Sequence, residues 1–191
     1  MTKIAVIVGS IREGSFNQML AKLAIARLEA HGAAVTEVDL AAFDLPIYSA
    51  ALEANNFPPD ALRLKEILAE QDGLLVVSPE YNGSVPPLLK NAIDWASRPT
   101  GDEGLVALSA YRGKAAAIMS ASLSPFGGLR ALMHLRQILT TIQMVVVPDQ
   151  VSVPAAHAAY DSDGGLKEEL LTTLVDITTA RLIKVSAALA D

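Results

Sequence analysis

Short apolar runs recur along the chain, and most of them are apolar at nearly every position. They consist largely of β-branched or small residues, which is typical of strands in a parallel sheet that helices cover on both faces. The run 34–40 mixes polar and apolar residues and therefore fits an edge strand better than a central one. The other predicted strands span 4–8, 74–78, 115–120 and 144–147, the last of which residues 151–153 could extend.

Between these runs, apolar residues recur at the three- and four-residue spacing of a helix face. The first helical pattern is followed by Gly32, which suits the left-handed residue that often ends a helix. Two segments, 41–59 and 99–113, lack any period and are predicted to be irregular. Helices are predicted over 16–31, 61–70, 86–95, 129–141 and 166–189.

The regular alternation of strand and helix predicts one α/β domain over residues 1–191, with a parallel sheet, helices on both faces and right-handed crossovers. The run 34–40 should lie on one side of the run 4–8, and the run 74–78 on the other. The chain therefore adds its second strand on one side of the first strand and its third strand on the other side. A ligand crevice is therefore expected there, beyond the carboxyl ends of the strands.

The loop after the first run has the features of a phosphate site. It begins at Gly9, and the helix after Ser15 offers free N–H groups and the positive end of a dipole. Ser15 and Gln18 have the spacing of a capping box, in which Ser15 binds the Gln18 N–H and Gln18 reaches back. The loop lacks the lysine of a Walker motif and the second glycine of a dinucleotide fingerprint. The remaining groups suit one terminal phosphate, and they belong to Ser10, Arg12, Ser15 and Asn17.

Each of these features also has a purely structural interpretation. Ser15 could only cap the helix, and Arg12 could be a solvated surface charge. The segment 79–83 could be a simple turn, because proline, asparagine and glycine are turn formers. Trp95 is expected to pack inside the protein, because its helix is apolar on neighbouring faces.

The composition narrows the range of functions. Of the 191 residues, 51% are hydrophobic, which permits one substantial core. A net charge of −6 and the lack of any stripe of lysine or arginine argue against nucleic acid as a partner. Cysteine is absent and the three histidines lie far apart, so neither a thiolate nor a metal site is expected. The first apolar run is too short for a signal peptide or a membrane span, so we expect a cytoplasmic protein with no membrane partner.

Two segments, 9–17 and 78–95, resemble the NADPH-dependent FMN reductases of flavodoxin-like fold, a family that includes quinone, chromate and azo-dye reductases. The resemblance spans nearly the whole chain and implies a three-layer sandwich whose five-stranded sheet has the order 2-1-3-4-5. It implies that the FMN phosphate is held by Ser10, Arg12, Ser15, Asn17 and Gln18. It implies that the isoalloxazine ring is lined by Pro79, Glu80, Tyr81, Asn82 and Gly83, with Ser120, Gly127 and Gly128 in a third block. Ala121 and Ser122 depart from this third block, in which many members carry further glycine.

A member of this family would be an enzyme that carries two electrons from NADPH or NADH through FMN to a quinone, an azo compound or another small acceptor. No catalytic side chain is then required, because the cofactor carries the chemistry. Two alternatives stay open: a flavodoxin-type electron-transfer protein and a flavin-binding regulatory module without turnover. Acceptor specificity would depend on the segments 41–59 and 99–112.

The helices predicted after the third and fourth runs carry more apolar surface than one sheet face should need. This excess predicts a homodimer or a dimer of dimers. The residues concerned are Leu88, Leu89, Ile93, Trp95, Leu132 and Leu135. The family resemblance points to a homotetramer.

Overall fold

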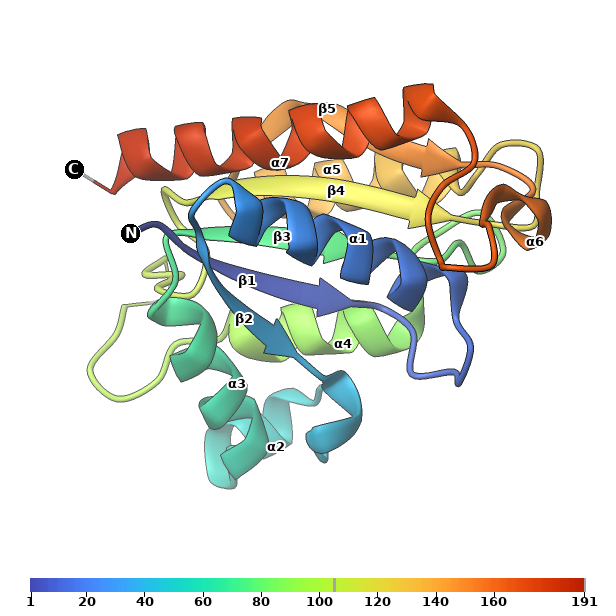
Figure 1. The fold of residues 1–191 in the computed structure, drawn as a ribbon. Helices are drawn as coiled ribbons and strands as arrows, with labels where there is room; N and C mark the ends of the chain where they lie inside the picture. Colours follow the sequence, from blue (N-terminus) through green and yellow to red (C-terminus); the bar gives the residue numbers. More distant parts are fainter. Residues whose placement is uncertain (105, 191) are drawn as a thin grey trace.

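The strands form one five-stranded parallel sheet in the computed structural model, which describes residues 1–104 and 106–190. The order β2-β1-β3-β4-β5 is the predicted one, with β2 at an edge (Figure 1). All four neighbouring pairs are parallel, so the carboxyl ends of the strands meet at one edge of the sheet. The strands are β1 (Lys3–Val8), β2 (Ala34–Val38), β3 (Gly73–Val77), β4 (Ala115–Ala121) and β5 (Val145–Val153).

The five predicted helices are confirmed with small shifts at their ends. The last helix begins three residues later than predicted, because Leu166 pairs with Tyr160 in an isolated antiparallel bridge. Three further helices of six residues or fewer are too short to show a helical period in the sequence. The helices are α1 (Phe16–Ala30), η1 (Leu40–Ala42, a 3-10 helix), α2 (Ala50–Asn55), α3 (Pro59–Ala69), α4 (Pro87–Ala96), α5 (Leu129–Thr141), α6 (Ala156–Ala159) and α7 (Glu169–Leu189).

Helices cover both faces of the sheet and enclose two hydrophobic cores. Ile4 and Val6 of β1 belong to the core beneath α1 and α7, whereas Ala5 and Ile7 belong to the core beneath α3, α4 and α5. Figure 1 shows α1 and α7 on the near side of the sheet and α4 on the far side. Every residue of β3 and β4 is buried, which explains why the sequences of these strands show no polar period.

The last strand is longer than its first apolar run and carries an irregularity. β5 continues through Pro148 to Val153, and its register against β4 shifts along the way. Proline is tolerated because β5 is an edge strand. The guanidinium of Arg136 on α5 donates to the carbonyl of Val147 at 2.9 Å, which satisfies a carbonyl near the irregularity.

Trp95 anchors the segment 41–59 to α4. Its side chain is fully buried, and its indole N–H donates to the carbonyl of Pro46 at 2.6 Å. The rings of Tyr48 and Phe57 meet the indole edge-on, with centroids 5.2 and 5.4 Å away. The prediction that Trp95 packs inside the protein is confirmed.

Lys65 ties α3 to the segment 99–112, of which Leu105 lies outside the described residues. The Lys65 ammonium is buried, donates to the carbonyl of Arg98 at 2.7 Å and pairs with the carboxylate of Glu103. One cation therefore holds a segment that has almost no regular structure of its own.

Candidate functional site

Three polar loops meet at the carboxyl edge of the sheet, on the right of Figure 1. They follow β1, β3 and β4. The Gly9 N–H donates to the carbonyl of Val77 at 2.9 Å, and the Ser78 N–H donates to the carbonyl of Met119 at 2.9 Å. Neighbouring strands thus hold the starts of the first two loops in register, at the edge where ligands bind in α/β sheets.

The loop after β1 is a tight turn with its cationic side chain folded over it. The Ser15 N–H donates to the carbonyl of Arg12 at 3.2 Å, and Gly14 has a positive φ of 65°. The guanidinium of Arg12 donates to the carbonyls of Glu13 and Gly14, each at 3.2 Å. Arg12 is exposed, so it can exchange these carbonyls for a stronger anionic partner.

The start of α1 differs from the predicted capping box. The Ser15 hydroxyl accepts the N–H of Asn17 at 3.3 Å, whereas the Gln18 side chain donates to the carbonyl of Ser10 at 3.3 Å. The predicted Ser15–Gln18 pairing is wrong, because the Ser10 carbonyl competes successfully for the Gln18 amide. Among the described residues, the N–H groups of Phe16 and Gln18 have no hydrogen-bond partner. Such groups at a helix N-terminus form an anion site.

Asn17 lies behind this loop and is buried. Its Nδ2 donates to the carbonyl of Ala121 at 2.8 Å, and its Oδ1 accepts the N–H of Ala121 at 2.9 Å. Ala121 is the last residue of β4. The carboxamide of Asn17 is therefore engaged by the sheet on both of its polar atoms.

An aromatic stack supports the same turn from the other side. The rings of Phe16 and Tyr160 are stacked, with centroids 6.1 Å apart and planes 6° from parallel. The Tyr160 hydroxyl donates to the carbonyl of Phe16 at 3.0 Å, and burial raises the pKa of this phenol. The guanidinium carbon of Arg12 lies 5.9 Å from the centre of the Phe16 ring. No local pattern in the sequence pointed to Tyr160, which is 144 residues away from Phe16.

The loop after β3 contains a two-residue hairpin. Tyr81 and Ser84 exchange backbone hydrogen bonds of 2.9 and 3.0 Å. Asn82 and Gly83 between them have φ angles of 51° and 79°, as an Asn-Gly turn of type I′ requires. The turn interpretation of this segment is thus confirmed in geometry, and the turn leaves the Tyr81 ring 49% exposed at the surface.

Glu80 links this loop to α5. Its side chain is 5% exposed and accepts hydrogen bonds from Arg130 Nε at 2.8 Å and from the N–H groups of Arg130 and Ala131 at 3.1 and 3.3 Å. Desolvation alone would raise the pKa of Glu80, but the hydrogen bonds from Arg130 and Ala131 outweigh it and lower the pKa. Sequence reasoning missed Arg130. One signal was available, because α5 begins after Gly128, which has no side chain to cap the helix.

The loop after β4 uses its glycines for packing within the chain. A side chain at Gly127 would contact the backbone of Val153 at 2.8 Å, and one at Gly128 would overlap the hydroxyl of Ser120. Both glycines also have positive φ angles, 59° and 87°. Ser120 is fully buried, and its Oγ has no hydrogen-bond partner among the described residues.

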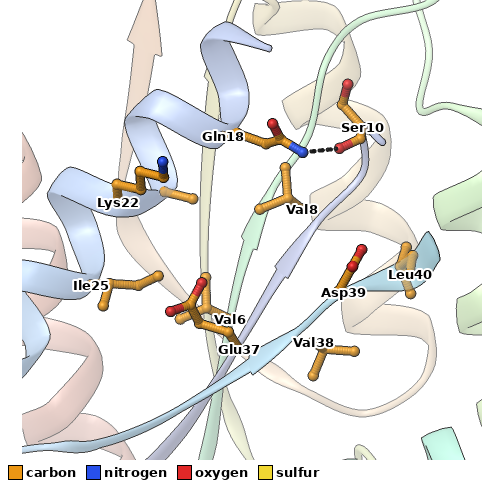
Figure 2. Close-up of a pocket in the computed structure, with 11 residues that line it drawn as sticks. Val6, Val8, Ser10, Gln18, Lys22, Ile25, Glu37, Val38, Asp39 and Leu40 are labelled. Carbon is orange, nitrogen blue, oxygen red and sulfur yellow. Dashed lines mark hydrogen bonds between the residues drawn. The ribbon is translucent and has the colours of Figure 1, made fainter. Parts of the chain in front are cut away.

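A cavity of about 320 Å³ lies between α1, β1 and β2, beside the loop after β1. Figure 2 shows Gln18 and Ser10 at one end, with Lys22, Glu37 and Asp39 around it. The cavity shares only Ser10 and Gln18 with the predicted site residues. None of the residues predicted to line a flavin ring borders this cavity.

The described residues contain no cluster of three or more histidine, aspartate or glutamate side chains able to hold a metal ion. Of the helices in residues 1–104 and 106–190, none is both long enough and apolar enough to span a bilayer.

Residues 2–158 match the family model described as NADPH-dependent FMN reductase. A 2-hydroxy-1,4-benzoquinone reductase from a Burkholderia species is 38% identical over 168 residues, which are 87% of this chain and 86% of that protein. An NAD(P)H-dependent FMN reductase from Pseudomonas aeruginosa is 36% identical and aligns with 91% of this chain and 89% of its own length. The solved structure of FerB, a flavoenzyme NAD(P)H:(acceptor) oxidoreductase from Paracoccus denitrificans, superposes with a TM-score of 0.83 at 30% identity and covers 98% of both chains.

Proposed function

Because this chain belongs to the NADPH-dependent FMN reductase family, we propose that it reduces a quinone or a similar flat, small acceptor with electrons from NADPH or NADH. Family membership confirms the predicted flavodoxin-like fold, the oxidoreductase activity, the FMN cofactor and the dependence on NAD(P)H. It favours an enzyme over an electron carrier or a regulatory module. The acceptor class is proposed from relatives that are named as quinone reductases.

The residues of the first loop fit the phosphate of FMN. The observation that carries the proposal is the pair of partnerless N–H groups at Phe16 and Gln18, next to the exposed Arg12 guanidinium. One dianionic phosphate would satisfy such donors without a metal ion. We assign phosphate binding to this loop and the first turn of α1, where the predicted residues Ser10, Arg12, Ser15, Asn17 and Gln18 lie.

The ring of the flavin is assigned to the loop after β3, where Pro79 to Gly83 form a surface stiffened by the hairpin and by the Glu80–Arg130 pair. Bound FMN supplies the two-electron chemistry between the nicotinamide and the acceptor. The protein groups of this loop would position the ring, and the half-exposed Tyr81 would offer a flat apolar surface to an aromatic acceptor. Ser120, also predicted to bind the cofactor, is fully buried next to Gly128.

The proposed activity is tested by anaerobic mixing of FMN-loaded protein with NADPH or NADH. We expect the flavin absorbance near its visible maximum to fall rapidly with at least one nucleotide and to return when benzoquinone is added. Protein without added nucleotide is the control. Absorbance that does not change with either nucleotide, or that fails to recover with benzoquinone, would reject the proposal.

The oligomeric state is proposed to be a homodimer or a homotetramer, although five of the six residues predicted to form its surface cannot do so, and only Leu88 is partly exposed. Leu89, Ile93, Trp95, Leu132 and Leu135 are buried within the chain, because they pack onto the sheet. A different apolar set lies exposed on α5 and the loop before it, and it comprises Leu123 (64%), Phe126 (60%), Leu129 (40%) and Met133 (62%). Exposed apolar side chains on one helix and the loop before it favour self-association.

Light scattering at micromolar concentration is expected to give the mass of two or four chains. A Met133→Lys variant should shift that mass downward, whereas Lys184→Gln on α7 should leave it unchanged. A monomeric wild-type protein would contradict the proposal.

Because its reductant is NAD(P)H, we also propose that the protein works in the cytoplasm.

A further inference from the structure

We propose that the Asn17 carboxamide is a positioning group that joins the phosphate loop to the end of β4, rather than a ligand of the phosphate. The family resemblance would place Asn17 among the phosphate ligands. The proposal rests on the proposed flavin site, and it assigns to Asn17 control over both the phosphate half and the ring half of that site.

The end of β4 needs a hydrogen-bonding partner that no strand supplies. β3 pairs with β4 only as far as Val77 and Met119, and the Ser78 N–H then donates to the Met119 carbonyl. On the other side of β4, the Ser122 N–H donates to the carbonyl of Val153 at 3.1 Å. The N–H and carbonyl of Ala121 face away from β5, where β3 has already ended, and both would be buried without a partner.

The Asn17 side chain supplies the hydrogen bonds that a neighbouring strand would otherwise make to Ala121. This side chain donates a hydrogen bond of 2.8 Å to the Ala121 carbonyl and accepts one of 2.9 Å from the Ala121 N–H. One primary amide therefore pairs with both backbone groups. The Asn17 residue is 3% exposed, which leaves little room for a ligand beside the carboxamide. The side chain is therefore committed to β4, and a phosphate can approach only its backbone.

The connection reaches both halves of the proposed site. Asn17 is the second residue of α1, so its position sets the direction of the free N–H groups of Phe16 and Gln18. Ala121 ends β4 and leads into the following loop, whose Gly128 packs against Ser120 and precedes α5. The start of α5 is in turn held by Glu80 from the loop after β3. Releasing Asn17 from Ala121 should loosen the ring half as well as the phosphate half.

The two roles predict different effects on FMN and on riboflavin, which has the same ring but no phosphate. As a positioning group, Asn17→Ala should weaken riboflavin binding by about tenfold, as expected for loss of roughly 1.4 kcal/mol of binding energy, and should weaken FMN binding by at least that factor. As a phosphate ligand, Asn17→Ala would weaken only FMN. The matched control is Arg12→Ala, which should weaken FMN and spare riboflavin.

Dissociation constants from quenching of flavin fluorescence give both affinities for each variant. Amide hydrogen exchange of Ala121, measured in the flavin-free protein, reports directly on the hydrogen bonds between Asn17 and Ala121. The exchange should be faster in Asn17→Ala than in wild type or in Arg12→Ala. Asn17→Asp serves as a second variant of the same size that keeps the acceptor for the Ala121 N–H. Asn17→Asp should weaken the binding of both flavins, whereas a carboxylate facing the phosphate would weaken the binding of FMN alone.

Selective loss of FMN in both Asn17 variants, with riboflavin affinity and Ala121 exchange unchanged, would overturn the inference. Unchanged affinity for both flavins would overturn it too, because the contact would then stabilise the fold without positioning the site. If the wild-type protein bound neither flavin, the proposed function itself would fail. Amide exchange of Ala121 needs no flavin, so it tests the Asn17–Ala121 contact even if the proposed function fails.

Discussion

Replacement of Arg12 by alanine is expected to weaken FMN binding by about tenfold to a hundredfold. A hydrogen bond to a charged group contributes about 1.5–3 kcal/mol, and every 1.4 kcal/mol is tenfold in affinity. Among the described residues, the guanidinium donates to two neutral backbone carbonyls at 3.2 Å and lies over the Phe16 ring. Exchange of these neutral acceptors for a dianionic phosphate is therefore favourable.

A fluorescence titration of FMN into the flavin-free protein measures this effect. Arg27→Ala is the matched control, because Arg27 is an exposed arginine in the last turn of α1, at the far end of the helix that follows the Arg12 loop. The difference between Arg12→Ala and wild type should shrink as salt increases, because an exposed charge is screened. An FMN dissociation constant unaffected by Arg12→Ala would leave Arg12 as an ordinary surface residue.

Replacement of Lys65 by methionine is expected to lower the free energy of unfolding by about 3 kcal/mol. Removal of one partner from a buried ion pair typically costs about 3–5 kcal/mol, because the other charge stays behind. The Lys65 side chain is 4% exposed, whereas that of Glu103 is 26% exposed, so water can partly solvate the remaining carboxylate. This access places the expected loss at the lower end of the range.

The same variant should change the dependence of stability on pH. Desolvation alone would raise the pKa of Glu103, but hydrogen bonds from Lys65, Ser109 and the Thr100 N–H lower it from 4.5 to about 2. Because the folded pKa lies below the unfolded one, the stabilisation is complete above pH 4.5 and is lost as the pH falls toward 2. Lys65→Met should remove much of this loss, so its deficit relative to wild type should be smaller near pH 2 than at pH 7.

Urea unfolding at several pH values tests both parts of this prediction. Lys184→Met on α7 is the control, since Lys184 is an exposed lysine far from the segment 99–112. A Lys65→Met protein as stable as wild type at pH 7 would show that the pair only fixes the position of the segment. A constant deficit across the pH range would show that the effect comes from packing of the lysine stem and not from its charge.

The fold was accessible to sequence reasoning because its signals are local. Buried strands such as β3 are apolar at every position, and helices such as α5 repeat their apolar residues over three turns, so neither depends on distant partners for its type. The Asn82-Gly83 turn is specified by two adjacent residues that tolerate positive φ. The location of the loop to which we assign phosphate binding follows in the same way from one strand, one glycine and one helix start.

By itself, the sequence determined the order of the elements, the two loops that carry the family's motifs and the acidic, cysteine-free character of the chain. Only the tertiary structure decided what individual polar side chains do. Asn17 pairs with Ala121 across 104 residues, Glu80 caps α5 across 50 residues, and the Gln18 amide prefers the Ser10 carbonyl to the predicted cap. Each polar group takes whichever buried partner the fold brings within hydrogen-bonding distance, and such long-range proximity leaves no periodic mark in the sequence.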